Sequence, residues 1–339
     1  MKRFVLRSLL FAVLLVGLVG GVCWAEISAE IGAYRRELAA PDGKKAVICG
    51  NSRTEMGLDP MVWPELFNFS VSGRTADQSF LTLIDVLEAN PGKFKTVLID
   101  ISAEEACQDL SLPVGKLDFS AQYYLLYLLH PAERMRDLDG LVGVFRDNMV
   151  GKRLRAFLRA LRGIKRFKSS LAAGFDPSDT CYPLSDPVKF KARVLKVKSQ
   201  TDDLPSVTLA APYFKLLDRM VAHCRARGAE PVFVTMPWHR DLIEARGLDQ
   251  LRAYVDLVGR YALRQGCRYL NLLEMDVPDE CWIDGNHLNR NGAKILTKRI
   301  ADFAKGKTAS DGAAVAFEEK APSSRPADSV RARAVESAQ

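Results

Sequence analysis

Histidine is scarce in this sequence, with only four among 339 residues. The seven cysteines show neither the spacing of a zinc site nor that of a dense disulfide scaffold. The net charge is +7, yet no basic patch is interleaved with the aromatic side chains that single-strand nucleic-acid binders use. Histidines and carboxylates also do not cluster at metal-ligand spacing. We therefore expect no metal, no cofactor and no nucleic-acid partner.

The first 25 residues have the pattern of an export signal. Lys2, Arg3 and Arg7 precede 18 uncharged, mostly apolar residues, 8–25. At about 1.5 Å per residue this stretch is just long enough to cross a bilayer, and Cys23-Trp24-Ala25 also fits a cleavage site. A signal anchor and a cleaved signal peptide both stay open. In either case the basic N-terminus predicts that the following domain lies outside the cytoplasm, either anchored to the cell membrane or periplasmic or secreted.

Five short apolar runs predict the strands of a parallel sheet. Each run is nearly continuous in Val, Ile, Leu and Phe, as expected where helices cover both faces of a sheet. The runs are 45–49, 66–71, 96–101, 231–236 and 269–273. Helical stretches alternate with them at about 76–89, 213–227, 249–265 and 291–303. This alternation predicts a doubly wound, three-layer α/β domain over residues 44–305.

About a hundred residues separate the third and fourth predicted strands, far more than one crossover helix needs. We interpret residues 104–212 as a large helical insertion. Within it, residues 152–168 place six apolar side chains at helical spacing among eight Lys and Arg. This basic amphipathic pattern fits a lid helix with a solvated face, or a helix that binds anionic lipid or a membrane partner. Residues 306–339 lack apolar periodicity, which predicts a disordered tail.

Two segments place reactive side chains where chemistry is expected. Ser52 follows the first predicted strand, at the carboxyl edge where open α/β sheets bind ligands. Taken alone, a Ser after a Gly turn is more often the N-cap of a helix than a catalytic residue. Asp284 and His287 lie three residues apart in a Gly- and Asn-rich turn before the last predicted helix. Because a serine nucleophile needs a base and the base needs an orienting carboxylate, we predict that Ser52, His287 and Asp284 form a catalytic triad.

Other candidate site residues surround this triad. Gly73 follows the second strand, and its N–H could join that of Ser52 in an oxyanion hole. Arg53 and Arg74 each come one residue after a site element, so they could contact an acidic glycan or instead form ion pairs. His239, which ends the fourth strand segment, is the reserve base.

Together these segments resemble the SGNH (GDSL-like) hydrolase superfamily. Gly50-Asn51-Ser52 is similar to its first block, Gly73 to its second-block glycine, and Asp284-x-x-His287 to its fifth block. The resemblance covers residues 44–300 and implies a flavodoxin-like sheet. The third block usually supplies an Asn to the oxyanion hole, whereas this chain has Ile99-Asp100-Ile101-Ser102. Either Ser102 substitutes for that Asn, or the hole has only the two backbone donors.

The departure in the third block, the N-terminal segment and the insertion resemble one subset of the superfamily, the alginate acetylation proteins and the D-alanine transfer protein of teichoic acid synthesis. Many members work with a membrane-bound O-acyltransferase. The resemblance implies an esterase or O-acyltransferase that acts on acyl esters of a cell-envelope glycan through an acyl-serine. Two alternatives are a catalytically degenerate domain that serves as a scaffold for a glycan or an acyltransferase, and a free carbohydrate esterase or lipase.

Overall fold

The computed structural model describes residues 2–103, 130, 175–176, 178–200 and 211–307. All five predicted strand segments lie within this part of the chain. The predicted basic helix at 152–168 lies outside it, as does the predicted tail beyond residue 307.

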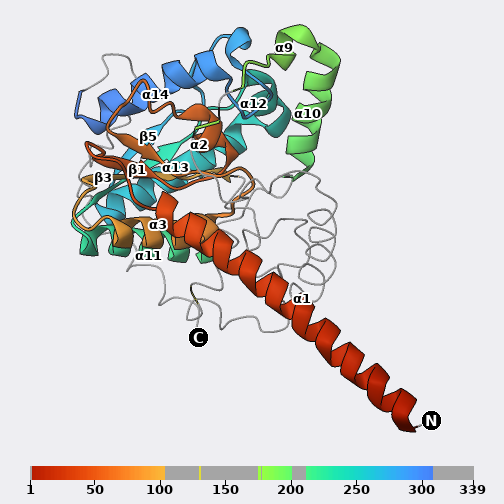
Figure 1. The fold of residues 1–339 in the computed structure, drawn as a ribbon. Coiled ribbons are helices and arrows are strands. Elements are labelled where there is room, and N and C mark those ends of the chain that lie inside the picture. Colours follow the sequence, from red (N-terminus) through yellow and green to blue (C-terminus); the bar gives the residue numbers. More distant parts are fainter. Residues whose placement is uncertain (1, 104–129, 131–174, 177, 201–210, 308–339) are drawn as a thin grey trace, which may run out of the picture.

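A five-stranded sheet forms the centre of the domain (Figure 1). Its strand order is β2-β1-β3-β4-β5, and every neighbouring pair is parallel. The strands are β1 (Ala46–Ile48), β2 (Leu66–Asn68), β3 (Thr96–Asp100), β4 (Glu230–Thr235) and β5 (Arg268–Asn271). This order is the flavodoxin-like one, which confirms the predicted doubly wound α/β class. Its topological switch point lies between β1 and β3, where ligands bind in such sheets.

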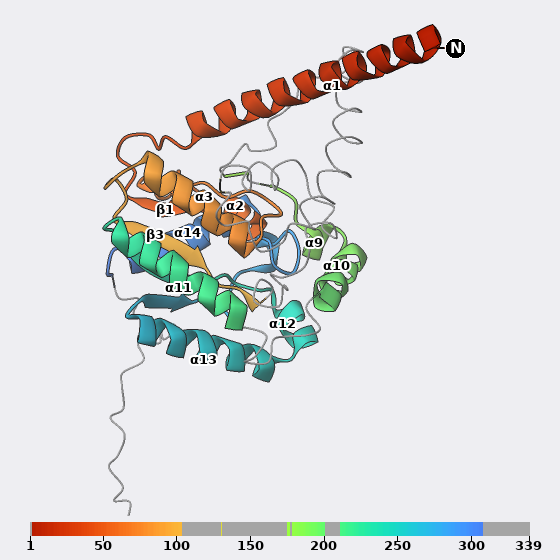
Figure 2. The same ribbon diagram turned by 90° about the horizontal axis from the view of Figure 1, so that it is seen from below.

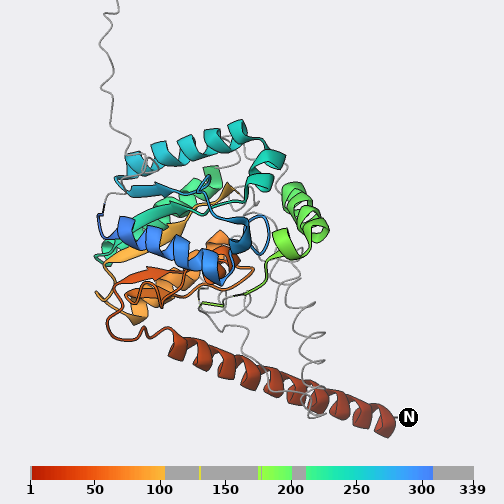
Figure 3. The same cartoon turned by 90° about the horizontal axis from the view of Figure 1, so that it is seen from above.

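Helices cover both faces of the sheet (Figures 2 and 3). One face carries α3 (Ala76–Ala89), α11 (Ala211–Ala226) and α13 (Leu248–Gln265). The other face carries α2 (Ser52–Gly57) and α14 (Arg290–Ala304). Apolar side chains form one buried cluster on each face, as the three-layer prediction requires.

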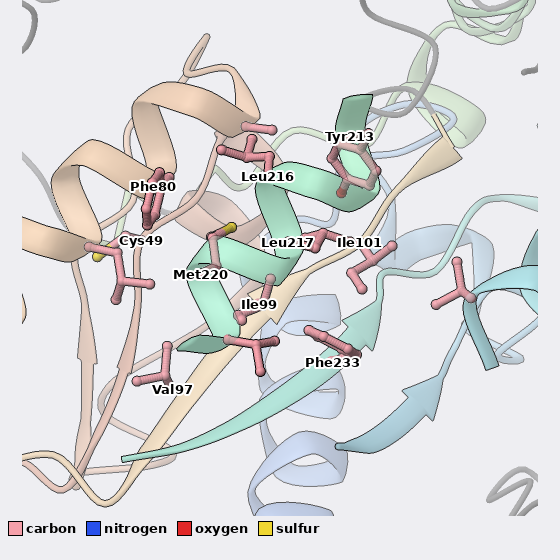
Figure 4. Packing of buried hydrophobic residues seen from close by; sticks show 14 of the residues in the cluster. Cys49, Phe80, Val97, Ile99, Ile101, Tyr213, Leu216, Leu217, Met220 and Phe233 are labelled. Carbon is pink, nitrogen blue, oxygen red and sulfur yellow. The ribbon is translucent and has the colours of Figure 1, made fainter. Parts of the chain in front are cut away.

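The strands supply both clusters because their side chains alternate between the two faces. In β3, Val97 and Ile99 belong to one cluster and Leu98 to the other. Figure 4 shows Phe80 of α3 and Met220 of α11 on the side of Val97 and Ile99. Fully burying a side chain of this size stabilises the fold by about 1.5–3 kcal/mol. The two clusters keep rigid the edge of the sheet from which the site residues project.

The N-terminal helix α1 (Lys2–Glu37) is longer than the predicted apolar segment 8–25. Near its C-terminal end, the buried Tyr34 donates a hydrogen bond to Asp85 Oδ2 on α3 at 2.8 Å. The rest of α1 runs away from the α/β domain (Figure 1). Within the part of the chain that the structure describes, no helix is both long and apolar enough to cross a membrane.

The predicted insertion between the third and fourth strands is represented by two described helices. These are α9 (Tyr182–Ser185) and α10 (Pro187–Gln200), which precede the crossover helix α11. Helix α10 packs against α12 (Arg240–Arg246), a short helix that follows β4 (Figures 1 and 2). The insertion therefore contacts the elements at the carboxyl ends of the strands.

Candidate functional site

Backbone pairing between the first two strands continues past their ends and sets the position of the site. The N–H of Val71 donates to the carbonyl oxygen of Gly50 at 3.0 Å. Ser52 lies two residues beyond Gly50, and Gly73 two residues beyond Val71. The chain therefore brings both predicted site residues to the same edge of the sheet.

Ser52 is the first residue of α2, and its predecessor Asn51 is the cap. Asn51 has an extended backbone, and its Oδ1 accepts a hydrogen bond from the N–H of Arg53 at 3.0 Å. An oxygen at this place satisfies an N–H group that the first turn leaves unpaired. The N-cap interpretation of Ser52 is therefore wrong, and its hydroxyl is available for another partner.

That partner is His287, which lies 235 positions further along the chain. Ser52 Oγ is 2.8 Å from His287 Nε2, and His287 Nδ1 is 2.8 Å from Asp284 Oδ1. Asp284 is buried, whereas Ser52 and His287 are partly exposed. The structure thus brings the three predicted triad residues into one hydrogen-bonded line.

A narrow loop holds Asp284 and His287 in this position. Trp282 and Leu288 form an antiparallel bridge across the base of the loop, and both are buried. Asn289 then caps α14, because its Oδ1 accepts hydrogen bonds from two backbone N–H groups of the first turn, at 3.0 and 3.2 Å. The loop is therefore anchored at both ends by buried structure.

Gly292 is the point at which α14 packs against this loop. A Cβ on Gly292 would lie 2.5 Å from the carbonyl oxygen of Cys281, closer than real Cβ atoms approach. We expect Gly292→Ala to displace α14 and to lower the free energy of unfolding by about 1–3 kcal/mol, measured by thermal or urea denaturation. Lys294→Ala, on the exposed face of the same helix, is the matched control. Equal stability of the two variants would show that the loop can move away from the added Cβ without lowering the free energy of unfolding.

Asp284 is ionised at neutral pH although it is buried. Burial by itself raises the pKa of a carboxyl group, but hydrogen bonds from His287, from the N–H of Asn286 and from Arg193 outweigh it and lower the pKa of Asp284. An ionised carboxylate stabilises an imidazolium and fixes the ring so that the opposite nitrogen faces the nucleophile. The site can therefore take a proton from the Ser52 hydroxyl.

The carboxyl end of β3 contains a buried ion pair. Arg53 Nη2 lies 3.0 Å from Asp100 Oδ2, and the two side chains are 3% and 2% exposed. The same nitrogen donates to Ser102 Oγ at 2.6 Å. Pairing with Arg53 offsets the negative charge by which Asp100 would repel an oxyanion. The role of Ser102 as an oxyanion donor stays a prediction.

Arg53 and Arg74, for which the sequence left contact with an acidic glycan and ion pairing open, are both buried. Arg74 is 4% exposed, and its Nη1 donates to the carbonyl oxygen of Phe69 at 2.7 Å. Its guanidinium also lies 5.7 Å from the centre of the Phe69 ring. Both arginines serve internal contacts, because a buried guanidinium requires partners within the protein.

His239, the predicted reserve base, lies beside the triad loop. Its Nδ1 accepts a hydrogen bond from the N–H of Asp241 at 3.1 Å, and its Nε2 is 3.3 Å from Asp279 Oδ1. Its own N–H donates to the carbonyl oxygen of Gly285 at 2.8 Å. Both ring nitrogens therefore have partners other than Ser52, and the residue supports the loop.

Gly73 occupies the left-handed region at φ +80°, which favours glycine. The preceding Ser72 donates a hydrogen bond to the carboxylate of Glu55, so the loop is attached to α2. Burial raises the pKa of Glu55, although the bond from Ser72 opposes this shift. This attachment holds the loop next to the helix that Ser52 begins. The N–H groups of Ser52 and Gly73 stay the predicted oxyanion donors.

The described residues contain neither a candidate metal site nor a disulfide bond. Within these residues, His, Cys, Asp and Glu form no group of three or more that could hold a metal ion. The structure shows free thiols at Cys49, Cys181, Cys224, Cys267 and Cys281. Cys49, beside Gly50, is buried in the apolar cluster, and burial raises its pKa to about 12. Cys49 therefore acts as a small apolar side chain that fills the core.

Sequence reasoning missed Arg193. This residue of α10 lies 3.0 Å from Asp284 Oδ2, although the two positions are 91 apart in the sequence. No motif marks Arg193, because its contact depends on how the insertion packs. Only the basic character of residues 189–198 could have drawn attention to it.

No known protein-family model matches this chain, and no curated protein is significantly similar to it. Among solved structures, it is similar to a GDSL-like lipase from Bacteroides thetaiotaomicron, with 13% identity and a TM-score of 0.39 over 80% of this chain and 97% of that one. A second similar structure is a protein assigned as an acylhydrolase from Bacteroides fragilis, with 12% identity and a TM-score of 0.38 over 80% and 93%. Likenesses this distant carry no functional argument, so the function is argued from the site.

Proposed function

We propose that this chain is an extracytoplasmic serine esterase or O-acyltransferase that acts on acyl esters of a cell-envelope glycan. One observation carries the proposal: Ser52 Oγ, His287 and Asp284 are joined by two contacts of 2.8 Å each. These distances are within the reach that a nucleophile, its base and an orienting group require.

The proposed reaction has two steps. Ser52 Oγ attacks the acyl carbonyl carbon while His287 Nε2 takes its proton, and that proton then goes to the alcohol that leaves. The N–H groups of Ser52 and Gly73 stabilise the oxyanion, where one donor typically lowers the barrier by about 3–4 kcal/mol. The resulting acyl-Ser52 is released when His287 deprotonates either water, giving an esterase, or a sugar hydroxyl, giving a transferase.

The envelope location and the glycan rest on the sequence. The apolar segment at 8–25 and the resemblance to exported acyl-transfer proteins support a domain outside the cytoplasm, attached by its N-terminal segment or released. A membrane-bound O-acyltransferase that delivers the acyl group is the partner in this proposal. Helices α9 and α10, which pack at the edge of the site, are the elements that would contact an acceptor.

One observation favours a second candidate, a degenerate domain that binds a glycan or an acyltransferase as a scaffold. Asp100 stands in the third block, where the superfamily usually has Asn, and it is engaged by Arg53. The oxyanion hole therefore lacks the usual amide donor. The intact triad geometry argues for catalysis instead.

Labelling with a fluorophosphonate, followed by intact-mass analysis, separates the two candidates. We expect the full chain to gain one probe adduct on Ser52, Ser52→Ala to gain none, and His287→Ala to react at least 100-fold more slowly, since a general base typically contributes about 10²–10⁴-fold. Ser185→Ala, which removes an exposed hydroxyl from α9, is the control and should react like the wild type. A folded wild-type chain that takes up no probe would favour the scaffold.

A further inference from the structure

We propose that Arg193 is a positioning residue of the triad, carried by the insertion, which holds the Asp284 carboxylate in place for His287. The inference rests on the proposed serine chemistry. It concerns a residue that acts through Asp284 and need not touch the substrate.

The two oxygens of Asp284 have different partners. Oδ1 lies 2.8 Å from His287 Nδ1, and Oδ2 lies 3.0 Å from Arg193 Nη1. Arg193 therefore binds Oδ2, the carboxylate oxygen that His287 does not contact. The two contacts together restrict rotation of the Asp284 carboxylate. Charge-assisted bonds of this kind are about twice as strong as neutral ones. Because Asp284 is only 10% exposed, water can do little to replace Arg193.

Arg193 is itself held in position. Its guanidinium lies 4.4 Å from the centre of the Tyr182 ring on α9, a cation–π arrangement. Lys189 Nζ donates to the Tyr182 hydroxyl at 3.1 Å. One turn before Arg193, the buried Phe190 packs against the His239 ring with ring centres 4.8 Å apart. The insertion is thus docked on both sides of the arginine.

The charge of Arg193 has a predictable effect on the pH dependence of the reaction. Elements packed around the triad loop carry other charged or titratable side chains, among them Tyr182, Lys189, His239, Arg240, Asp241, Asp279 and Glu280. Besides His287, Arg193 is the charged side chain that the structure shows bonded to Asp284 among the described residues. Without it, the carboxylate charge would act on His287 alone and favour the imidazolium. Loss of the Arg193 charge should therefore move the acid limb of the rate profile upward.

The test compares Arg193→Gln, Arg193→Lys and Lys191→Gln in the full chain. The last variant removes an exposed charge from the same helix and is the matched control. The rate constant for fluorophosphonate labelling of Ser52 is measured from about pH 5 to 9, where histidine titrates. We expect Arg193→Gln to react about tenfold more slowly at neutral pH, a fraction of the 10²–10⁴-fold that a general base supplies. Its acid limb should rise by on the order of one pH unit.

The lysine variant separates charge from geometry. Arg193→Lys keeps the charge and loses the fork of the guanidinium, so it should react slowly while its acid limb stays near that of the wild type. Lys191→Gln should match the wild type in both respects. The Arg193 side chain is 38% exposed, so these variants leave the core untouched.

Three outcomes would overturn the proposal in distinguishable ways. A wild-type rate and acid limb in Arg193→Gln would show that Arg193 does not position the triad, while the proposed function stands. A slower Arg193→Gln with an unmoved acid limb would indicate a structural contact only. A folded wild-type chain that is not labelled on Ser52 would overturn the proposed function and this inference with it.

Discussion

Asp284→Asn is expected to lower the rate of Ser52 acylation by about 10⁴-fold while the fold stays intact, as loss of the triad carboxylate does in serine proteases. The amide fills the same space but presents an N–H group where the imidazole must donate. His287 then takes the wrong tautomer, and the developing imidazolium loses its counter-charge. The rate constant of probe labelling, measured for proteins with matching melting temperatures, checks this result.

The chain contains a matched control for this substitution. Asp279 Oδ1 lies 3.3 Å from His239 Nε2, whereas Asp284 Oδ1 lies 2.8 Å from His287 Nδ1, and the two aspartates lie five positions apart. Asp279→Asn should therefore react with the probe at close to the wild-type rate. A large loss in Asp279→Asn with little change in Asp284→Asn would transfer the role of base to His239.

The loss of one partner from the buried Arg53–Asp100 ion pair is expected to destabilise the domain strongly. Asp100→Ala removes the carboxylate that lies 3.0 Å from the guanidinium of Arg53, a side chain that is 3% exposed. Removing one member of a buried pair typically costs about 3–5 kcal/mol, because the remaining charge cannot be hydrated. For a domain of this size, that corresponds to a fall in melting temperature of roughly 10 °C.

Replacing both partners tests the reason for that loss. Arg53→Met combined with Asp100→Leu removes both charges of this pair and should recover most of the stability, since neither is buried without the other. Glu88→Ala, which breaks an exposed pair with Arg227, should leave the melting temperature almost unchanged. If the double variant were as unstable as Asp100→Ala, the pair would be needed for its shape and hydrogen bonds rather than for charge balance.

The sheet could be predicted from the sequence because burial on both faces leaves continuous apolar runs. Helix α3 begins and ends where predicted, at Ala76 and Ala89. The second strand was predicted to continue to residue 71, but β2 ends at Asn68. Beyond that point the segments after β1 and β2 still pair, because the N–H groups of Phe69 and Val71 donate to the carbonyl oxygens of Ile48 and Gly50. Strand ends depend on these long-range bonds, which composition does not report.

By itself, the sequence determined the doubly wound class and the three residues of the proposed triad. Ser52, Asp284 and His287 could be found because turn chemistry and position after a strand are local properties. Tertiary structure alone decided that Arg53 is internal and that Arg193 reaches Asp284. The physical reason is that the local sequence around a charged residue does not show whether its side chain is buried or which group it pairs with. Those depend on which distant segment packs beside it, here β3 for Arg53 and the triad loop for Arg193.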